Sequence, residues 1–204
     1  MKKTIMVFSV LSCAAIAGAA LPADAIFREA EDFKQIEKGW DVVPHGQHGY
    51  RGRPSGGKLV RGFQSAMGKL SDTFTVTKAG DYKINFRYLD LQNLGQTVVR
   101  NEIAFRVTVT QNDKTVAEKI FDDGESIRST PDGKAKWGNG WGEFVWGTLD
   151  AKLEAGEFTI TFSKVHRRDT TGLARNIDCV LITSDASYEP KVEDFEKKQE
   201  EQKL

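Results

Sequence analysis

Apolar and polar residues alternate along most of this chain with a period of two, which is typical of half-buried β-strands. The clearest example is DYKINFRYLD at 81–90, where one face carries Tyr82, Ile84, Phe86 and Tyr88. The same alternation predicts strands at 102–111, 115–123 and 157–165. Because only the polar NDK stands between the first two of these, we expect them to form a hairpin.

Further patterns complete the predicted strands. RNIDCVLITSD at 175–185 is apolar on both faces, which predicts a central strand covered on both sides, with Cys179 as a small buried hydrophobe. Shorter strands are predicted at 26–33, 59–63, 72–77 and 143–150. In the last of these, Trp146 follows Phe144 at strand spacing and is predicted to lie in the core. Trp40, after the first strand, fits either the core or a ligand site.

The chain also echoes itself at two points. AGDYKINF at 79–86 and AGEFTITF at 155–162 share the pattern Ala-Gly-acid-aromatic-x-Ile-x-Phe, and each follows a strand and opens another. The glycine provides the backbone freedom that a tight turn needs. Many strands separated by turn residues, with a single helical pattern, predict an all-β fold with one antiparallel β-sandwich. The echo then marks two similarly built corners of that sandwich.

The two ends of the chain differ from this middle. Residues 1–25 contain two lysines, an apolar run and small residues ending in Ala-Asp-Ala, the layout of a secretory signal peptide cut after Ala25. The β-sandwich domain is therefore predicted at 26–188, in a secreted or periplasmic protein. A lipoprotein signal that leaves an acylated Cys13 is the alternative. The charged stretch 189–204 predicts a solvated helix or a disordered tail, because it has too few apolar residues to bury.

Charge and cysteine content exclude several classes of function. The 29 basic and 29 acidic residues balance, so no bulk charge recruits nucleic acid or a membrane surface. No stretch beyond the signal approaches the roughly 20 apolar residues that a membrane helix requires. Cys179 is the only cysteine after the signal, so the exported chain has no internal disulfide and its stability depends on a core.

Four motifs resemble those of a known family in order and approximate spacing. They are REAEDF at 28–33, VTKAGDYKINFRYLD at 76–90, LEAGEFTITF at 153–162 and RNIDCVLITSD at 175–185. Together they resemble β-jelly-roll carbohydrate-binding modules of the galactose-binding-like type, families 6 and 35. The resemblance covers 26 to about 185, and is closest to single modules in exported proteins of polysaccharide-degrading bacteria. It implies a jelly roll that binds a polysaccharide without catalysing a reaction.

The resemblance also implies a structural calcium ion, held by Glu29, Glu31 and Asp178. Calcium prefers several hard oxygen ligands, and carboxylates at positions i and i+2 of a strand project from the same face. Backbone carbonyls from the loops would complete the coordination. The alternative is that Glu29 and Glu31 face solvent or pair with Arg28 and Arg175.

Three of the four tryptophans lie in KWGNGWGEFVW at 136–146. Sugars present apolar C–H faces and hydroxyl groups, so their binding sites combine an exposed aromatic ring with a few polar groups. Trp137 and Trp141, with Asn139 between them in a glycine-rich loop, match that requirement. The same two rings also fit a packing role beneath neighbouring loops.

Two loops are basic, YRGRPSGGKLVRG at 50–62 and KVHRRDTTGLAR at 164–175. The candidate ligand-binding residues in them are Tyr50, Arg51, Arg167 and Arg168. If the loops converge, their guanidinium groups suit a carboxylated or sulfated saccharide, because arginine binds such groups bidentately. Tyr50 would add a stacking surface. The alternative is two separate solvated loops.

No catalytic constellation is present in the sequence. His45 and His48 have a spacing that holds zinc on a helix, but their surroundings predict a loop and no acidic partner completes a zinc motif. Glu29 and Glu31 point together, whereas glycosidase carboxylates face each other across a bound sugar. We therefore expect a non-enzymatic protein that binds a polysaccharide or other glycan. The alternatives are a structural or adhesion module that binds a protein partner at the cell surface, and a small polysaccharide-acting enzyme.

Overall fold

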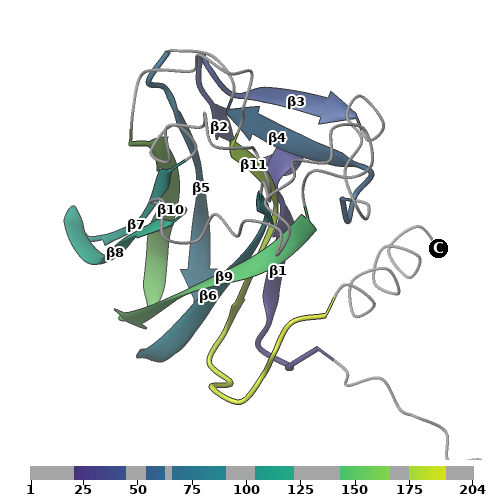
Figure 1. The fold of residues 1–204 in the computed structure, drawn as a ribbon. Coiled ribbons are helices and arrows are strands. Elements are labelled where there is room, and N and C mark those ends of the chain that lie inside the picture. The colour runs from purple at the N-terminus through teal and green to yellow at the C-terminus, as the bar shows by residue number, and fades with distance from the viewer. Residues whose placement is uncertain are drawn as a thin grey trace, which may run out of the picture.

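Two antiparallel β-sheets pack face to face in the computed structural model, which describes residues 21–44, 54–62, 66–90, 104–121, 143–165 and 175–191 (Figure 1). The first sheet has the order β3 (Asp41–Pro44), β4 (Lys58–Gly62), β11 (Arg175–Thr183), β6 (Gly80–Asp90) and β9 (Glu143–Leu153), and β1 (Ile26–Glu29) also pairs with β11. The second sheet has the order β2 (Gln35–Ile36), β5 (Lys69–Val76), β10 (Gly156–Lys164), β7 (Phe105–Gln111) and β8 (Lys114–Phe121). The predicted all-β antiparallel sandwich is confirmed.

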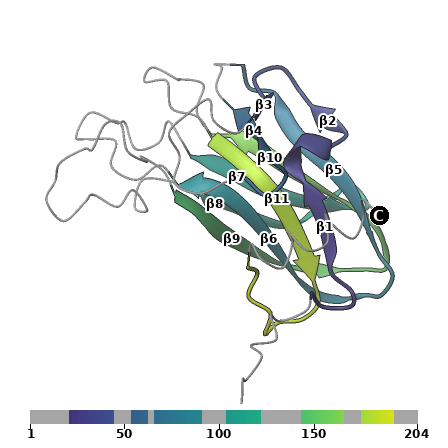
Figure 2. The ribbon, with the colours of Figure 1, turned by 90° about the vertical axis from the view of Figure 1, so that its right-hand side faces the viewer.

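The central strand of the first sheet is β11, whose nine residues are all buried. Figure 2 shows β11 and β1 side by side, and the register pairs Glu29 of β1 with Cys179 of β11. Cys179 is a buried free cysteine, and burial raises the pKa of its thiol well above the ordinary value. The prediction of a strand covered on both sides, with a small buried hydrophobe in it, is confirmed.

The first predicted strand, 26–33, is divided in the structure. β1 ends at Glu29, and the 3-10 helix η1 (Ala30–Asp32) follows it. The physical reason is topological, because β1 belongs to the first sheet and β2 to the second, so the chain has to turn between the layers. Ala30 is fully buried at this turn, where a larger side chain would not fit.

The connection between β7 and β8 is the predicted hairpin. Its two central residues, Asn112 and Asp113, have φ angles of 51° and 60°. Positive φ at both positions is the requirement of a type I′ turn, and asparagine and aspartate tolerate it better than most residues. The two polar residues between the alternating stretches therefore determine the hairpin locally.

The two echoing motifs are corners at which the chain changes sheets. The first lies between β5 and β6, and the second between β9 and β10. Gly156 has a φ of 131°, which side-chain-bearing residues rarely adopt, so glycine is needed there. Gly80 is not among the described glycines with positive φ. The predicted corners are confirmed, but only the second depends on the conformational freedom of glycine.

Aromatic rings join the two sheets at the centre of the sandwich. Phe86 of β6 meets Phe105, Phe121 and Phe162 of the second sheet edge-on, with centroid distances of 5.9, 4.7 and 5.4 Å. Edge-on packing of this kind adds to the gain from burying the rings. Gly147 pairs with Phe86 across β6 and β9, and its missing side chain leaves room for the ring.

The structure settles the two tryptophans that it describes. Trp40 is 3% exposed, and its Nε1 donates a hydrogen bond to the carbonyl of Gly68 at 2.7 Å, so it belongs to the core. The prediction that Trp146 lies in the core is wrong. The residues of β9 that face the core are Val145, Leu149, Ala151 and Leu153. Because neighbouring side chains of a strand point to opposite faces, Trp146 lies on the outer face of the first sheet, where it is half-buried. There it packs against a small apolar cluster that contains Leu181, Tyr188 and Phe27.

Substituting Gly147 tests the packing of Phe86. A Cβ atom at Gly147 would lie 2.4 Å from Cζ of Phe86, so we expect Gly147→Ala to lower the free energy of unfolding by about 1–3 kcal/mol. Urea unfolding monitored by circular dichroism measures this change. Gly80→Ala is the matched control, because its Cβ would meet only Tyr82 at 3.9 Å. Equal losses in the two variants would contradict the packing that we describe.

Candidate functional site

Asp178 occupies a β-bulge in the central strand. Ile177 pairs with Tyr88 of β6, and Cys179 pairs with the adjacent Arg87, which leaves Asp178 as the extra residue. On the other edge of β11, the pairing changes here from β4, which reaches Ile177, to β1, which begins at Cys179. A bulge bends its strand and re-aims a side chain, and this one lies where three neighbouring strands meet.

Arg87 neutralises Asp178 inside the protein. Its Nη1 lies 2.6 Å from Oδ2 of Asp178, and the two side chains are 7% and 0% exposed. Burial raises the pKa of Asp178, while Arg87 and a hydrogen bond from the backbone N–H of Ser55 (2.9 Å) act in the opposite direction. The guanidinium group also lies over the ring of Phe144, 4.4 Å from its centroid. The pair therefore joins β11 to β6 and β9.

Glu29, at the end of β1, lies beside this pair. It is 8% exposed, and its Oε2 accepts a 2.6 Å hydrogen bond from the hydroxyl of Ser55. Burial raises the pKa of Glu29 to about 8, and the charges of Asp178 and Glu31 add to the effect, while the Ser55 hydrogen bond opposes it. Ser55 thus contacts both carboxylates and holds the segment before β4 against them.

Glu31 approaches the same point from η1. A Cβ atom on Gly56 would lie 2.6 Å from Oε1 of Glu31 and 3.3 Å from Oε1 of Glu29, so the absence of a side chain at Gly56 leaves room for both carboxylates. Burial raises the pKa of Glu31, and Lys58 weakly opposes this. The prediction that the two glutamates share the face of one strand is wrong, because the strand ends at Glu29. They meet because η1 turns the chain.

The structure thus brings together the three predicted metal ligands. We call Glu29, Glu31 and Asp178 the carboxylate cluster. Oε2 of Glu31 is buried and has no hydrogen-bond partner within the described ranges. Hard oxygen donors and a buried oxygen in need of a partner fit the chemistry of calcium. However, no three acidic, histidine or cysteine side chains of the described residues are arranged as a metal-binding group, and Asp178 is already paired with Arg87. The fit is therefore strongest for the two glutamates.

The two arginines considered as partners of the glutamates both contact other residues. Arg28 lies 3.5 Å from Asp72 of the second sheet, and Nε of Arg175 donates to the carbonyl of Ala104 at 3.1 Å. Glu29 is buried rather than solvated. The alternative in which Glu29 faces solvent is therefore wrong, whereas Glu31 is half-buried.

The predicted ligand-binding residues lie outside the described residues. They are Tyr50, Arg51, Trp137, Asn139, Trp141, Arg167 and Arg168, and the same holds for Cys13, His45, His48 and the tail from 192 onward. What the structure does place are the strand ends to which these segments connect. Among the parts of the chain that it describes, no helix is long and apolar enough to cross a membrane.

Several of these strand ends share one end of the sandwich. Asp90 at the end of β6 pairs with Glu143 at the start of β9. Phe105 at the start of β7 pairs with both Phe121 and Lys164, the last residues of β8 and β10. The segment with Trp137 and Trp141, between β8 and β9, and the segment with Arg167 and Arg168, after β10, are therefore attached at this end, which we call the loop end.

The segment that holds Tyr50 and Arg51 is attached elsewhere. It follows Pro44, which pairs with Lys58, and it leads into Ser55 and Gly56, which lie beside the carboxylate cluster. The cluster itself is close to the loop end, because Tyr88, which pairs with Ile177, is two residues from the end of β6. The segment with Tyr50 and Arg51 thus leads to the carboxylate cluster, near the loop end but not at the strand ends that define it.

Three residues at the site were not predicted. Arg87 is one of the polar residues on the outward face of its strand, and nothing in the local pattern distinguishes it from Lys83. Ser55 lies in a loop, and Phe144 carries no signal beyond its alternation. Their roles follow from the bulge at Asp178, which local sequence patterns do not reveal because a bulge depends on the pairing of two distant strands.

Removing Arg87 tests the buried pair. We expect Arg87→Met to lower the free energy of unfolding by about 3–5 kcal/mol, because it leaves Asp178 buried without a counter-charge. Urea unfolding measures this loss. Arg106→Met is the control, since Arg106 and Glu118 form an exposed pair at 3.3 Å that is worth at most about 1 kcal/mol.

A second substitution separates charge from packing. If the loss comes from the unpaired carboxylate, Asp178→Asn should recover part of it in the Arg87→Met background. Equal losses in Arg87→Met and Arg106→Met would contradict the central place that we give to the buried pair.

Among known proteins, only solved structures show a similarity to this chain, and that similarity is one of fold. The sequence matches no protein-family model and no curated protein. Among solved structures, a family 35 carbohydrate binding module from Clostridium thermocellum has 20% identity and a TM-score of 0.49, over 79% of this chain and 99% of that one. The C-terminal family 6 module of a marine laminarinase from Zobellia galactanivorans has 14% identity and a TM-score of 0.47, over 78% and 98%.

A longer protein is also similar. A mannanase with a family 35 module from Podospora anserina has 22% identity and a TM-score of 0.46, over 82% of this chain and 29% of that one. This chain therefore spans less than a third of the mannanase. The structure resembles carbohydrate-binding modules of families 6 and 35, the families that the motifs predicted, and at these identities and TM-scores the resemblance concerns the fold alone.

Proposed function

We propose that this chain is a non-catalytic carbohydrate-binding protein that recognises a polysaccharide at the loop end of its β-sandwich. The observation that supports this most directly is the common attachment of two segments. The segment with Trp137, Asn139 and Trp141 and the segment with Arg167 and Arg168 both start from strands that pair with the first residue of β7. Aromatic, amide and guanidinium groups are therefore supplied from one end of a rigid scaffold.

These residue types suit a sugar ligand. An aromatic ring covers the apolar C–H face of a sugar, and an amide makes paired hydrogen bonds with its hydroxyls. Arginine adds recognition of carboxylated or sulfated units, because its planar fork binds such groups bidentately. Loops on a rigid sandwich commonly carry such recognition, since the strands hold the positions from which the loops start.

The buried pair supports the loop end mechanically. Phe144 is the second residue of β9, directly after the segment with the tryptophans, and Arg87 lies over its ring. Because Arg87 is held by Asp178, the start of β9 is connected to the carboxylate cluster through two short contacts. We propose that this connection keeps the base of the tryptophan segment in a defined position.

We also propose that the carboxylate cluster holds a structural calcium ion. Glu29 and Glu31 would ligate it, with Asp178 as the third acidic residue beside them. Calcium would supply the positive charge that offsets the burial of the two glutamates. The unpartnered oxygen of Glu31 and the raised pKa values of both glutamates support the proposal.

The arrangement of the carboxylates supports a binding role rather than catalysis. Glu29 bonds to Ser55, Asp178 pairs with Arg87, and both are buried rather than placed on two sides of a cleft. A glycosidase needs two carboxyl groups separated by roughly 5 Å or more with the sugar between them. Two buried carboxylates held by these contacts do not match that arrangement.

Export of the protein remains part of the proposal. The signal-like residues 1–25 support a secreted or periplasmic protein cut after Ala25, with an acylated Cys13 as the alternative. In the uncut chain, the carboxylate of Asp24 accepts hydrogen bonds from Thr183 and Ser184. Cleavage after Ala25 would remove these contacts.

Tryptophan fluorescence tests sugar binding. Titration with a panel of neutral, uronic and sulfated polysaccharides should give a saturable shift for at least one glycan. Because we place the ligand against Trp137 and Trp141, we expect Trp137→Ala or Trp141→Ala to weaken binding by about tenfold or more. Trp40→Phe is the control, since Trp40 is in the core. Release of reducing ends from the same glycans would show an enzyme, and no response to any glycan would sink the proposal.

Calcium is tested by thermal unfolding with and without a chelator. A bound ion stabilises by about 2.7 kcal/mol at a hundredfold excess over its Kd, so chelation should lower the Tm of the calcium-loaded protein. Glu29→Gln and Glu31→Gln should abolish the difference, and Glu157→Gln, at an exposed position of β10, should not. A chelator-independent Tm would remove the cluster from any metal role.

The pH dependence provides a second readout. Glu29 has a folded pKa of about 8 against an ordinary 4.5, so in the metal-free protein its protonation stabilises below pH 4.5 and this contribution is lost as the pH rises through 8. A calcium ligand must be ionised, so the stabilisation by calcium should grow over the same range. Glu29→Gln should flatten both dependences.

A further inference from the structure

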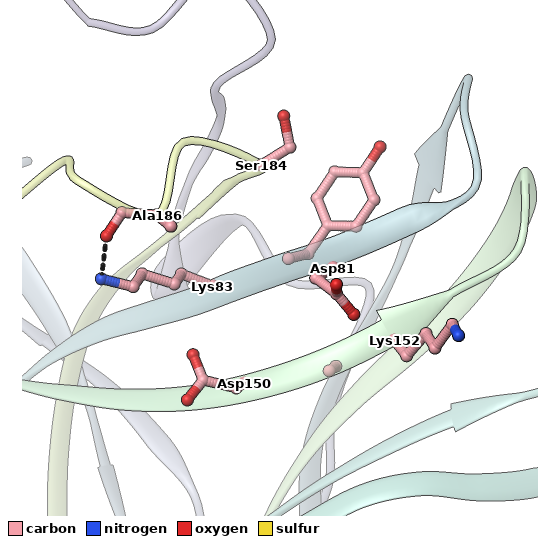
Figure 3. Close-up of a pocket in the computed structure, with 8 residues that line it drawn as sticks. Asp81, Lys83, Asp150, Lys152, Ser184 and Ala186 are labelled. Atoms are coloured by element: carbon pink, nitrogen blue, oxygen red, sulfur yellow. Dashed lines mark hydrogen bonds between the residues drawn. The ribbon is translucent and has the colours of Figure 1, made fainter.

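A groove of about 260 Å³ lies far from the carboxylate cluster, where β6 begins and β9 ends (Figure 3). Its lining residues are Asp81, Tyr82, Lys83, Asp150, Ala151, Lys152, Ser184 and Ala186. Asp81 is nine residues before Asp90, the last residue of β6, which corresponds to about 30 Å of strand. The groove is therefore remote from the loop end, and a ligand in it would leave that end accessible.

Four charged side chains lie at the groove as two cross-strand pairs, each of one aspartate and one lysine. Asp81 stands opposite Lys152, and Lys83 stands opposite Asp150 in the register of β6 and β9. Opposite charges in such positions usually pair across the strands. None of the ion pairs within the described ranges joins these four residues, and Lys83 donates instead to the carbonyl of Ala186, as Figure 3 shows. The remaining three charges are directed to solvent at the groove.

The wall of the groove is held in place by its own contacts. Asp185 accepts hydrogen bonds from the backbone N–H and the hydroxyl of Ser187, at 2.8 and 2.6 Å. Tyr188 is buried against Leu181 on the outer face of the sheet. Together with the bond from Lys83, these contacts hold the turn that carries Ser184 and Ala186, and in the uncut chain Asp24 also accepts hydrogen bonds from Ser184. A preformed wall reduces the entropy cost of binding.

The chemistry of the lining matches a neutral polyhydroxylated ligand. Two carboxylates and two ammonium groups sum to zero charge, so neither an anion nor a cation is favoured overall. Each hydroxyl group of a sugar can both donate and accept a hydrogen bond. Neighbouring hydroxyls therefore suit this lining, in which a carboxylate acceptor and an ammonium donor follow one another on each of the two strands. The volume lies below the roughly 300–1,000 Å³ of drug-sized ligand sites, and so suits one small ring.

We propose that this groove is a second sugar subsite, which binds a single neutral sugar residue of a glycan through Asp81, Lys83, Asp150 and Lys152. For its class of ligand this inference rests on the proposed function. The affinity is weak, with a Kd on the order of 1–10 mM, because so small a ligand makes few contacts. On a polysaccharide that reaches both sites, the groove adds avidity to the binding at the loop end.

NMR titration of the ¹⁵N-labelled full chain with D-glucose, D-galactose, D-mannose and D-xylose tests the groove. We expect saturable shifts at the amides of 81–83, 150–152 and 184–186 with at least one sugar. Asp150→Ala should weaken this response by about tenfold, the effect of one lost charge-assisted hydrogen bond. Glu157→Ala, which removes an exposed carboxylate on the other sheet, should leave it unchanged.

The outcomes separate the two sites. No shift at the groove amides with any of the four sugars would overturn the inference, as would shifts that persist unchanged in Asp150→Ala. Shifts with glycine alone would assign the groove to a small zwitterion and overturn its sugar chemistry. Binding of a polysaccharide that is lost in Trp137→Ala, with silent groove amides, would leave the proposed function intact. Groove shifts that persist while no glycan changes the tryptophan fluorescence would support the groove and sink the loop-end site.

Discussion

The buried ion pair between Arg87 and Asp178 is the interaction on which this end of the molecule depends. Desolvating two charges is costly, and the pair is tolerable only because the distance is short and Ser55 satisfies a further oxygen of Asp178. It joins three strands of the first sheet and orders the segment before β4. The same guanidinium covers Phe144, so the effect of the pair extends to the start of β9.

The carboxylate cluster includes one member of that pair. Arg87 offsets the charge of Asp178, and burial raises the pKa of both Glu29 and Glu31. Carboxylates whose pKa burial raises are common at functional sites, where a proton or a cation offsets the cost of burying the charge. The molecule therefore combines a core of phenylalanine rings with a cluster of buried carboxylates near the loop end. The opposite end of the first sheet carries the groove, whose charges cancel.

Much of the fold was predictable from local patterns. Alternation located β6, β7, β8 and β10, the double-sided apolar run located β11, and the two echoing motifs located the corners between the sheets. The failures share one cause, which is that local patterns do not say where a chain changes layers. The division of the first strand by η1 and the outward position of Trp146 both follow from layer assignment. Alternation distinguishes two faces of a strand, but it does not say which face a second apolar cluster covers.

The candidate site was predictable in its members but not in its geometry. The family motifs indicated Glu29, Glu31 and Asp178, and these three do converge. The geometry depends on a bulge at Asp178 and on the partners of its carboxylate. Arg87 and Ser55 lie 91 and 123 residues from Asp178 in the sequence. Local sequence patterns were enough to locate most strands, the hairpin and the corners, because these depend on residues within a turn or a strand of one another. The pairing of the buried charges became known only from the folded chain, because a buried charge meets its partner through the register of strands that are distant in sequence.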